Sequence, residues 1–184
     1  MLLELFLLHY HALVLRLYDP LLTTPGLNRA ATVSLCRMFP AANNFFNTHA
    51  ALSSSQLAAR PFTQSALLAF YIVSVSNLVL YEAPGWDSGI ARQHVDFAHH
   101  TAQLAEQFDA VDEFARANRR KRHMKGCSSL YREYGHKFRW MNQWYLGRIT
   151  DKPPEETVEP EIQWDDQFWE DLMFFQPIYP ISDV

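Results

Sequence analysis

The chain of 184 residues has little glycine and almost no cysteine. Six glycines are few for an architecture of strands and tight turns, which disfavours a β-rich fold. Two cysteines, Cys36 and Cys127, cannot form a disulfide framework or a thiolate metal site by themselves. We expect both to be small buried or half-buried thiols in a reducing compartment.

Lysine and arginine are absent from residues 153–184, which contain nine aspartates and glutamates. Ten of the sixteen basic residues instead lie between Arg116 and Arg148, so a basic zone is followed directly by an acidic end. A hydrophobic content of 48% argues for a packed globular protein. We expect a helical domain over residues 1–150, part of a larger one, and an acidic C-terminal segment over residues 151–184.

Charged residues are also missing from Pro61 to Tyr81. The alternation in Val73–Ser76 favours a strand, but the uncharged run is about twice the usual strand length and is flanked by helical patterns. We therefore expect a buried central helix. Polar side chains within the run, and the lack of a flanking basic cluster, disfavour a membrane span.

The first helix is expected over Leu2–Asp19 and is stopped by Pro20. Its apolar face contains Leu5, Leu8, Ala12, Leu15 and Tyr18. Further apolar residues widen this face until little polar surface is left: Leu3, Phe6, Leu7 and Leu17. A helix that is apolar nearly all round is expected in the interior, and the chain looks like a fragment of a larger protein.

A long amphipathic helix is expected from Asp87 to Val111. Its inner face is Ile90, His94, Phe97, Thr101, Leu104, Phe108 and Val111, with Ala91, Val95, Ala98, Ala102 and Ala105 beside it, and its outer face includes Arg92, Asp96, His99, His100 and Gln107. We interpret His94 as a hydrogen-bonded core histidine. A further helical region is expected from Asn28 to Leu52, interrupted and restarted at Pro40. Two more helices are expected, one beginning near Asp112 and one from Leu130 onward. The predicted fold is thus all-α, a bundle of about six or seven helices.

Asp96, His99 and His100 have the helical spacing of metal ligands. A di-metal bundle site needs Glu-x-x-His motifs on two helices and two further glutamates, so we interpret these three as solvated side chains. A phosphate loop, a nucleophile elbow and an HExxH motif are also lacking. We expect no enzyme activity and no cofactor in this chain.

The basic run from Arg116 to Lys125 has six lysines or arginines in ten residues. It is typical of a nuclear-import signal or a phosphate-contacting patch. The candidate residues are Arg119, Arg120, Lys121, Arg122 and Lys125. The alternative is a solvated helix face, with its charges balanced by Asp109, Asp112 and Glu113.

The acidic end alternates carboxylates with bulky apolar side chains, the composition of a transcriptional activation segment. The candidate partner-binding residues are Trp164, Phe168, Trp169, Leu172, Phe174 and Phe175. The alternative, with equal support, is a C-terminal helix that docks back onto the domain.

Three stretches resemble the regulatory domain, or middle homology domain, of fungal zinc-cluster transcription factors. They are Leu8–Leu22, the segment Pro61–Asp96 with its Pro84-Gly85-Trp86-Asp87 turn, and Phe168–Leu172. The resemblance implies a nuclear regulatory domain that acts on transcription machinery or co-regulators and has a possible small-molecule effector. Zinc belongs to the family's six-cysteine module, which is absent here, so sequence-specific DNA binding is not expected of this chain.

Two other functions remain open at this point. The interior beneath the central helix could bind a small molecule or form an enzyme site. The apolar segments could alternatively associate with a membrane. The oligomeric state has no signature that we identify in the sequence.

Overall fold

The computed structural model describes residues 2–19, 21, 28–59, 62–118 and 130–150. Within these ranges every regular element is an α-helix, so the predicted all-α fold is confirmed. In chain order the helices are α1 (Leu2–Tyr18), α2 (Arg29–Cys36), α3 (Met38–Ala50), α4 (Ser54–Ala58), α5 (Phe62–Leu80), α6 (Ser88–His94), α7 (Phe97–Asn118) and α8 (Leu130–Thr150).

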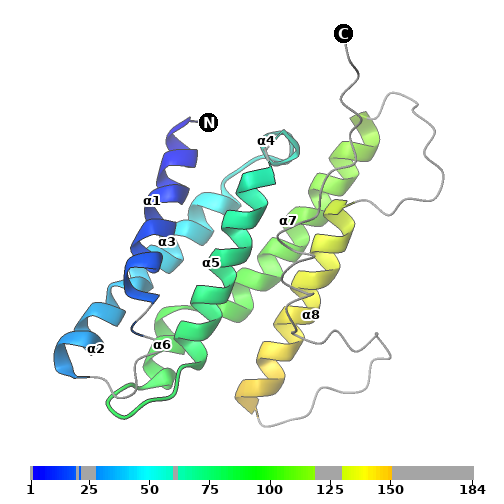
Figure 1. Cartoon of the computed structure of the whole chain (residues 1–184). Coiled ribbons are helices and arrows are strands. Elements are labelled where there is room, and N and C mark those ends of the chain that lie inside the picture. Colours follow the sequence, from blue (N-terminus) through cyan, green and yellow to red (C-terminus); the bar gives the residue numbers. More distant parts are fainter. Residues whose placement is uncertain (1, 20, 22–27, 60–61, 119–129, 151–184) are drawn as a thin grey trace.

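The helices form two groups that share α5 and α7 (Figure 1). On one side α1 packs against α3 and α5, and α2 leads into α3. On the other side α7 and α8 form the most extensive contact between two helices. The short helix α6 joins α5 to α7 at one end of the bundle, and α4 contacts α7 at the other.

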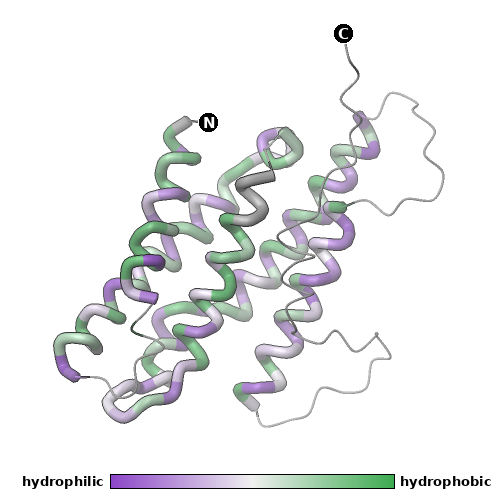
Figure 2. The backbone as a smooth tube through the Cα atoms, in the orientation of Figure 1, coloured by the Kyte–Doolittle hydropathy of each residue, from purple (hydrophilic) through white to green (hydrophobic). Residues whose placement is uncertain are grey.

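Helix α5 is the central element that the uncharged segment predicts. Its described side chains include Tyr71, Val75 and Leu78, all of which are completely buried. Figure 2 shows green predominating along α5, whereas α8 alternates between green and purple. No helix among the described residues is both long enough and apolar enough to cross a bilayer.

Local sequence signals explain where several helices begin. Asn28 Oδ1 accepts a hydrogen bond from the Ala31 amide at 2.9 Å, the expected N-cap of α2. Ser53 and Gln56 form a capping box at the start of α4. Pro40 is the third residue of α3, within the first turn, where its missing N–H has no intrahelical partner to lose. The helix therefore restarts just before Pro40, as predicted.

The expected helix from Asp87 to Val111 is two helices, and this prediction is corrected. The backbone of Val95 is extended, with φ −128° and ψ 100°, which ends α6 at His94. Asp96 then begins α7, because its Oδ1 accepts a hydrogen bond from the His99 amide at 2.9 Å. The predicted start of another helix near Asp112 is also wrong, since α7 continues to Asn118.

The break changes which side chains face inward. Ile90, predicted to be inside, is 49% exposed, while Ala91 and Val95 are completely buried. Beyond the break the inner face is confirmed, with Phe97, Thr101, Leu104, Phe108 and Val111 all buried. A helical period counted across Val95 therefore gives the wrong face before the break and the right one after it.

The first helix has one buried face, as predicted, formed by Leu8, Ala12 and Leu15. The expectation that it lies wholly in the interior is wrong. Leu3 is 70% exposed and Phe6 is 76% exposed. The reason is geometric, since α3 and α5 both lie on the same side of α1 and leave its other side bare.

Cys36 is exposed, which corrects the expectation of a buried or half-buried thiol. It occupies the last position of α2, directly after buried Leu35. Cys127 lies outside the described residues.

Candidate partner-binding surfaces

Both binding segments predicted from the sequence lie outside the described residues. The basic group Arg119, Arg120, Lys121, Arg122 and Lys125 falls between α7 and α8. The apolar group Trp164, Phe168, Trp169, Leu172, Phe174 and Phe175 follows α8. What the structure describes is the scaffold to which these two segments are attached.

The carboxylates expected to balance the basic run are largely engaged within the described part. Asp112 Oδ2 lies 2.6 Å from Arg116 Nη2, one helical turn further along α7. Asp109 instead pairs with Arg139 of α8, with oxygen–nitrogen distances of 2.6 and 3.4 Å. One of the expected carboxylates thus serves the contact between α7 and α8 rather than the basic run.

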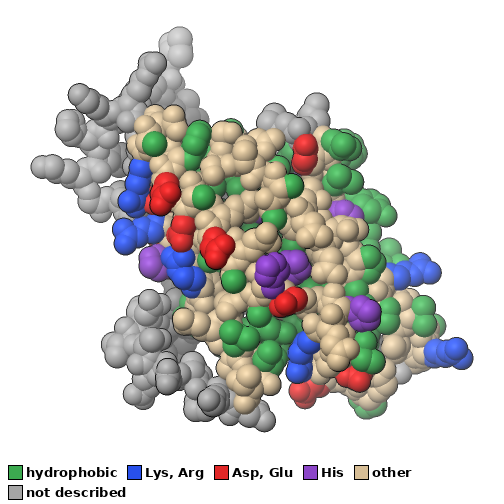
Figure 3. Space-filling view, turned by 180° about the vertical axis from the view of Figure 1, so that it is seen from behind, with side chains coloured by type: hydrophobic (Ala, Val, Ile, Leu, Met, Phe, Trp, Pro, Cys, Tyr) green, Lys and Arg blue, Asp and Glu red, His purple; other side chains and the backbone are tan. Residues whose placement is uncertain are grey.

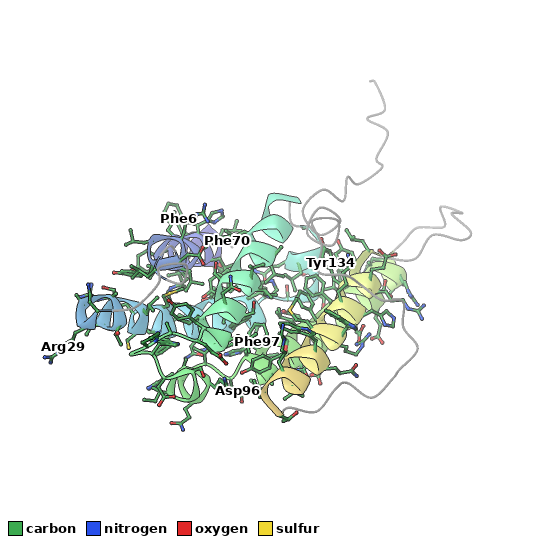
Figure 4. All side chains as sticks on the ribbon, turned by 60° about the horizontal axis from the view of Figure 1, so that its bottom comes forward. Phe6, Arg29, Phe70, Asp96, Phe97 and Tyr134 are labelled. Carbon is green, nitrogen blue, oxygen red and sulfur yellow. The ribbon has the colours of Figure 1, made fainter. Side chains whose placement is uncertain are left out.

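Aromatic side chains also contribute to the contact between α7 and α8 (Figure 4), as do hydrogen bonds from Asn142 Nδ2 to the Ala98 carbonyl and to Thr101 Oγ1, the latter at 2.8 Å. Phe97 meets Tyr145 at a ring distance of 5.0 Å near one end. Phe108 meets Tyr134 at 5.2 Å toward the other end. The two helix ends that flank the basic run are therefore held firmly together by ring packing and by the Asp109–Arg139 ion pair.

Asp96, His99 and His100 do not converge. Asp96 is occupied in capping α7 and His99 is exposed, whereas His100 is buried, with its ring 5.7 Å from that of His99. Among the described residues no group of three or more histidines, cysteines or carboxylates could hold a metal ion. The expectation that His100 is a solvated side chain is wrong.

His100 contacts α3 instead. Its ring stacks on Phe46 at 4.2 Å, and its Nε2 lies 3.2 Å from Asn43 Oδ1. Burial lowers the pKa of His100 to about 4, an effect that nearby His99 reinforces and Asp96 opposes. The imidazole is thus neutral at physiological pH and acts as part of the core. His94 takes the reverse role, because it is exposed and stacks on Phe39 at 5.0 Å, which corrects its assignment to the core.

Gln107, predicted on the outer face, is a second polar link between α3 and α7. Its Nε2 donates hydrogen bonds to the carbonyl oxygens of His49 and Leu52 at 3.0 and 3.2 Å. Its Oε1 lies 2.8 Å from His49 Nδ1. These bonds tie Gln107 to carbonyls in the last turn of α3 and just beyond it.

The Pro84-Gly85-Trp86-Asp87 turn forms the junction between α5 and α6. Gly85 has φ 86°, a conformation that glycine adopts without steric cost. The Trp86 amide donates to the Ala83 carbonyl at 3.0 Å, and the Trp86 ring lies 5.8 Å from that of Phe39. Asp87 Oδ1 then caps α6 through the amides of Gly89 and Ile90 at 2.8 and 3.2 Å.

Arg92 secures the same junction from α6. Its Nε donates to the Val79 carbonyl near the end of α5 at 3.1 Å, and its Nη2 donates to Ser88 Oγ at 2.9 Å.

Comparisons with protein-family models, with curated proteins and with solved structures found no match to this chain. The role of the Pro84-Gly85-Trp86-Asp87 turn therefore follows from its geometry, which is that of a structural corner between α5 and α6.

The space beneath α5 is filled by aromatic side chains. The Tyr71 and Phe45 rings are stacked at an interplanar angle of 12°, and the Phe46 ring meets Tyr71 edge-on at 5.6 Å. The Tyr71 hydroxyl donates to the Ala41 carbonyl at 2.6 Å, and burial raises the Tyr71 pKa well above its usual range. This packing disfavours a ligand site at the position where the sequence suggested one.

The outer face of α1 is an exposed apolar surface that was not expected from the sequence. Its side chains are Leu3, Phe6, Leu7, Tyr10, Leu13 and Leu17. The edge formed by α1 in Figure 1 comes to the right in the rear view of Figure 3, where hydrophobic side chains gather along it. Its signal in the sequence was a second set of apolar positions beside the buried set.

Proposed function

We propose that this chain is a regulatory and protein-interaction domain of a fungal zinc-cluster transcription factor and acts on transcription through protein partners. The observation that supports this most directly is the α5–α6–α7 corner. The residues that carry the family resemblance in this region, namely Gly85, Trp86, Asp87, Arg92 and Asp96, each make a defined contact there. Each of these residues thus has a structural role at the corner, which supports the proposal.

In this proposal the functional residues lie in the basic run and in the acidic end, the two segments outside this scaffold. The basic run would direct the chain to the nucleus, and the acidic aromatic end would bind co-regulators or the transcription machinery. DNA binding would belong to a six-cysteine module that these 184 residues do not contain. The proposal therefore expects the gene to encode that module upstream of Met1.

Nuclear import is tested with the full chain fused to a fluorescent tag large enough to prevent passive entry. Replacing Arg119, Arg120, Lys121 and Arg122 with alanine is expected to reduce nuclear accumulation. The matched control removes the same charge elsewhere, at the exposed residues Arg29, Arg37, Arg132 and Arg148, and is expected to leave localisation unchanged. Equal localisation of both variants and the parent would refute the import role.

Activation is tested by fusing the full chain to a heterologous DNA-binding domain upstream of a reporter. Substitution of Trp164, Phe168 and Trp169 with alanine is expected to abolish the reporter signal, since these large side chains would fill the partner's groove. The control replaces Ile178, Tyr179 and Ile181, three apolar residues of the same segment. Loss of signal in both variants, or in neither, argues against a defined activation motif.

A further inference from the structure

The outer face of α1 is the largest apolar surface on a single described helix. Leu3, Phe6, Leu13 and Leu17 are each more than 65% exposed, and Tyr10 is 59% exposed. Figure 4 shows Phe6 pointing away from the body of the protein, while Phe70 of the neighbouring helix lies on the α1–α5 side. Single exposed apolar side chains are ordinary, but a contiguous row marks an interaction site.

These residues follow the spacing of a coiled-coil seam. From Leu3 to Leu17 the steps are alternately three and four residues, through Phe6, Tyr10 and Leu13. A 3-4 repeat keeps one stripe of a helix facing a partner helix along its whole length. The buried residues Leu8, Ala12 and Leu15 lie on the opposite side, so α1 has one face for its own domain and one for another helix.

The size of the row fits a dimer. Large aromatic side chains present about 150–250 Å² each and leucines somewhat less, so at the observed exposures the outer face offers on the order of 700 Å². A stable protein–protein interface buries about 800 Å² on each partner. If α1 of another molecule covered this whole face, the buried area would come close to that size, and neighbouring elements would need to add the rest.

Charge indicates which partner the face suits. The acidic end of the chain would need cations along the row to pair with its carboxylates. The exposed cation there is Arg16, which lies 3.7 Å from Asp19 and stacks over the Phe70 ring at 5.3 Å. A surface that is apolar and nearly uncharged is best matched by an identical one, as in a two-fold symmetric interface.

We infer that the chain forms a homodimer through the outer face of α1, with Leu3, Phe6, Tyr10, Leu13 and Leu17 packed against the same residues of a second copy. This interface does not depend on the proposed role in transcription. The proposed dimer would cover an apolar surface that the core of a single chain leaves exposed.

Sedimentation velocity of the full chain over a range of concentrations tests the dimer. The wild-type protein is expected to reach twice the mass of one chain, with a dissociation constant in the micromolar range or tighter, as interfaces of this size give. Leu13→Glu buries a carboxylate twice in the symmetric interface and is expected to raise the dissociation constant by about 100-fold or more. Leu17→Glu serves as the second variant.

The matched control is Val33→Glu, which places the same charge on a 54% exposed apolar residue of α2. It is expected to dimerise like the wild type. Circular dichroism should show the same helix content in every variant, because the substituted side chains are exposed; a variant that unfolds is replaced by the other. A monomeric wild type, a higher oligomer, or a dimer that both Leu13→Glu and Leu17→Glu leave intact would overturn the inference. A wild-type monomer that floats with phosphatidylcholine vesicles would assign the face to lipid instead.

Discussion

The side-chain amide of Asn43 donates a hydrogen bond to the main-chain carbonyl of His94 at 2.8 Å. Its oxygen at the same time lies 3.2 Å from His100 Nε2. One residue of α3 thereby holds the last turn of α6 and the first turns of α7, on both sides of the break at Val95. The interruption that misled the sequence analysis is fixed by a side chain far away in the sequence.

Replacing Asn43 with alanine should therefore destabilise the fold. The His100 Nε2 and the His94 carbonyl would both lose a partner; the first bond is part-buried and the second exposed, so each is expected to contribute about 0.5–1.5 kcal/mol. Urea denaturation followed by circular dichroism measures the loss. Exposed Asn44 provides the matched control, and Asn44→Ala should change the unfolding free energy by less than about 0.5 kcal/mol. Equal effects of the two substitutions would show that the Asn43 bridge contributes nothing.

Acid should destabilise the protein through His100. Its pKa is about 4 in the folded chain, because of burial first and of His99 second, against 6.5 in the unfolded chain. Between these values the unfolded state binds the extra proton, so stability is complete above pH 6.5 and declines as the pH falls toward 4. The full shift corresponds to about 3 kcal/mol.

The measurement is the unfolding free energy of the wild type and of His100→Gln between pH 7 and pH 4. The variant should have the shallower pH dependence, because carboxylates titrate in both proteins and cancel in the comparison. His136→Gln, a substitution of an exposed histidine on α8, should keep the wild-type slope. A wild-type slope in His100→Gln would mean that His100 is not the titrating group.

Helices α7 and α8 approach closely at Gly135, a position that no pattern in the sequence singles out. A Cβ at this position would lie 2.6 Å from Asp109 Oδ1, and Arg139 holds that carboxylate in place. Gly135→Ala should therefore be destabilising by about 1–3 kcal/mol, although alanine is the better helix former by about 1 kcal/mol.

A double-mutant cycle separates the clash from the propensity. In an Asp109→Ala background the obstructing oxygen is gone, so Gly135→Ala should become neutral or stabilising there. Thermal or urea unfolding of the four proteins gives the coupling. If Gly135→Ala costs the same in both backgrounds, the Asp109 carboxylate is not the obstacle.

The fold class and most buried faces were predictable because helical periodicity survives in a single sequence. The faces of α7 beyond Asp96 and of α1 toward α3 follow directly from spacing. The buried face before Val95 was predicted wrongly because the extended backbone of Val95 interrupts the helical period. Asp96, as a possible N-cap, was the sequence feature that indicated the break. Spacing could not show that the other side of α1 stays exposed, because that side is also apolar and its cover depends on where α3 and α5 lie.

Arg92 should contribute to stability through the α5–α6 corner. It is partly buried and spans two acceptors, the Val79 carbonyl and Ser88 Oγ. Arg92→Ala should cost about 1.5–3 kcal/mol, the range for hydrogen bonds from charged groups. Arg92→Lys keeps the charge but lacks the planar fork, so it should recover only part of that loss. Urea unfolding tests both variants against Gln93→Ala, an exposed neighbour expected to be nearly neutral. If Arg92→Ala is as mild as Gln93→Ala, the guanidinium does not stabilise the corner.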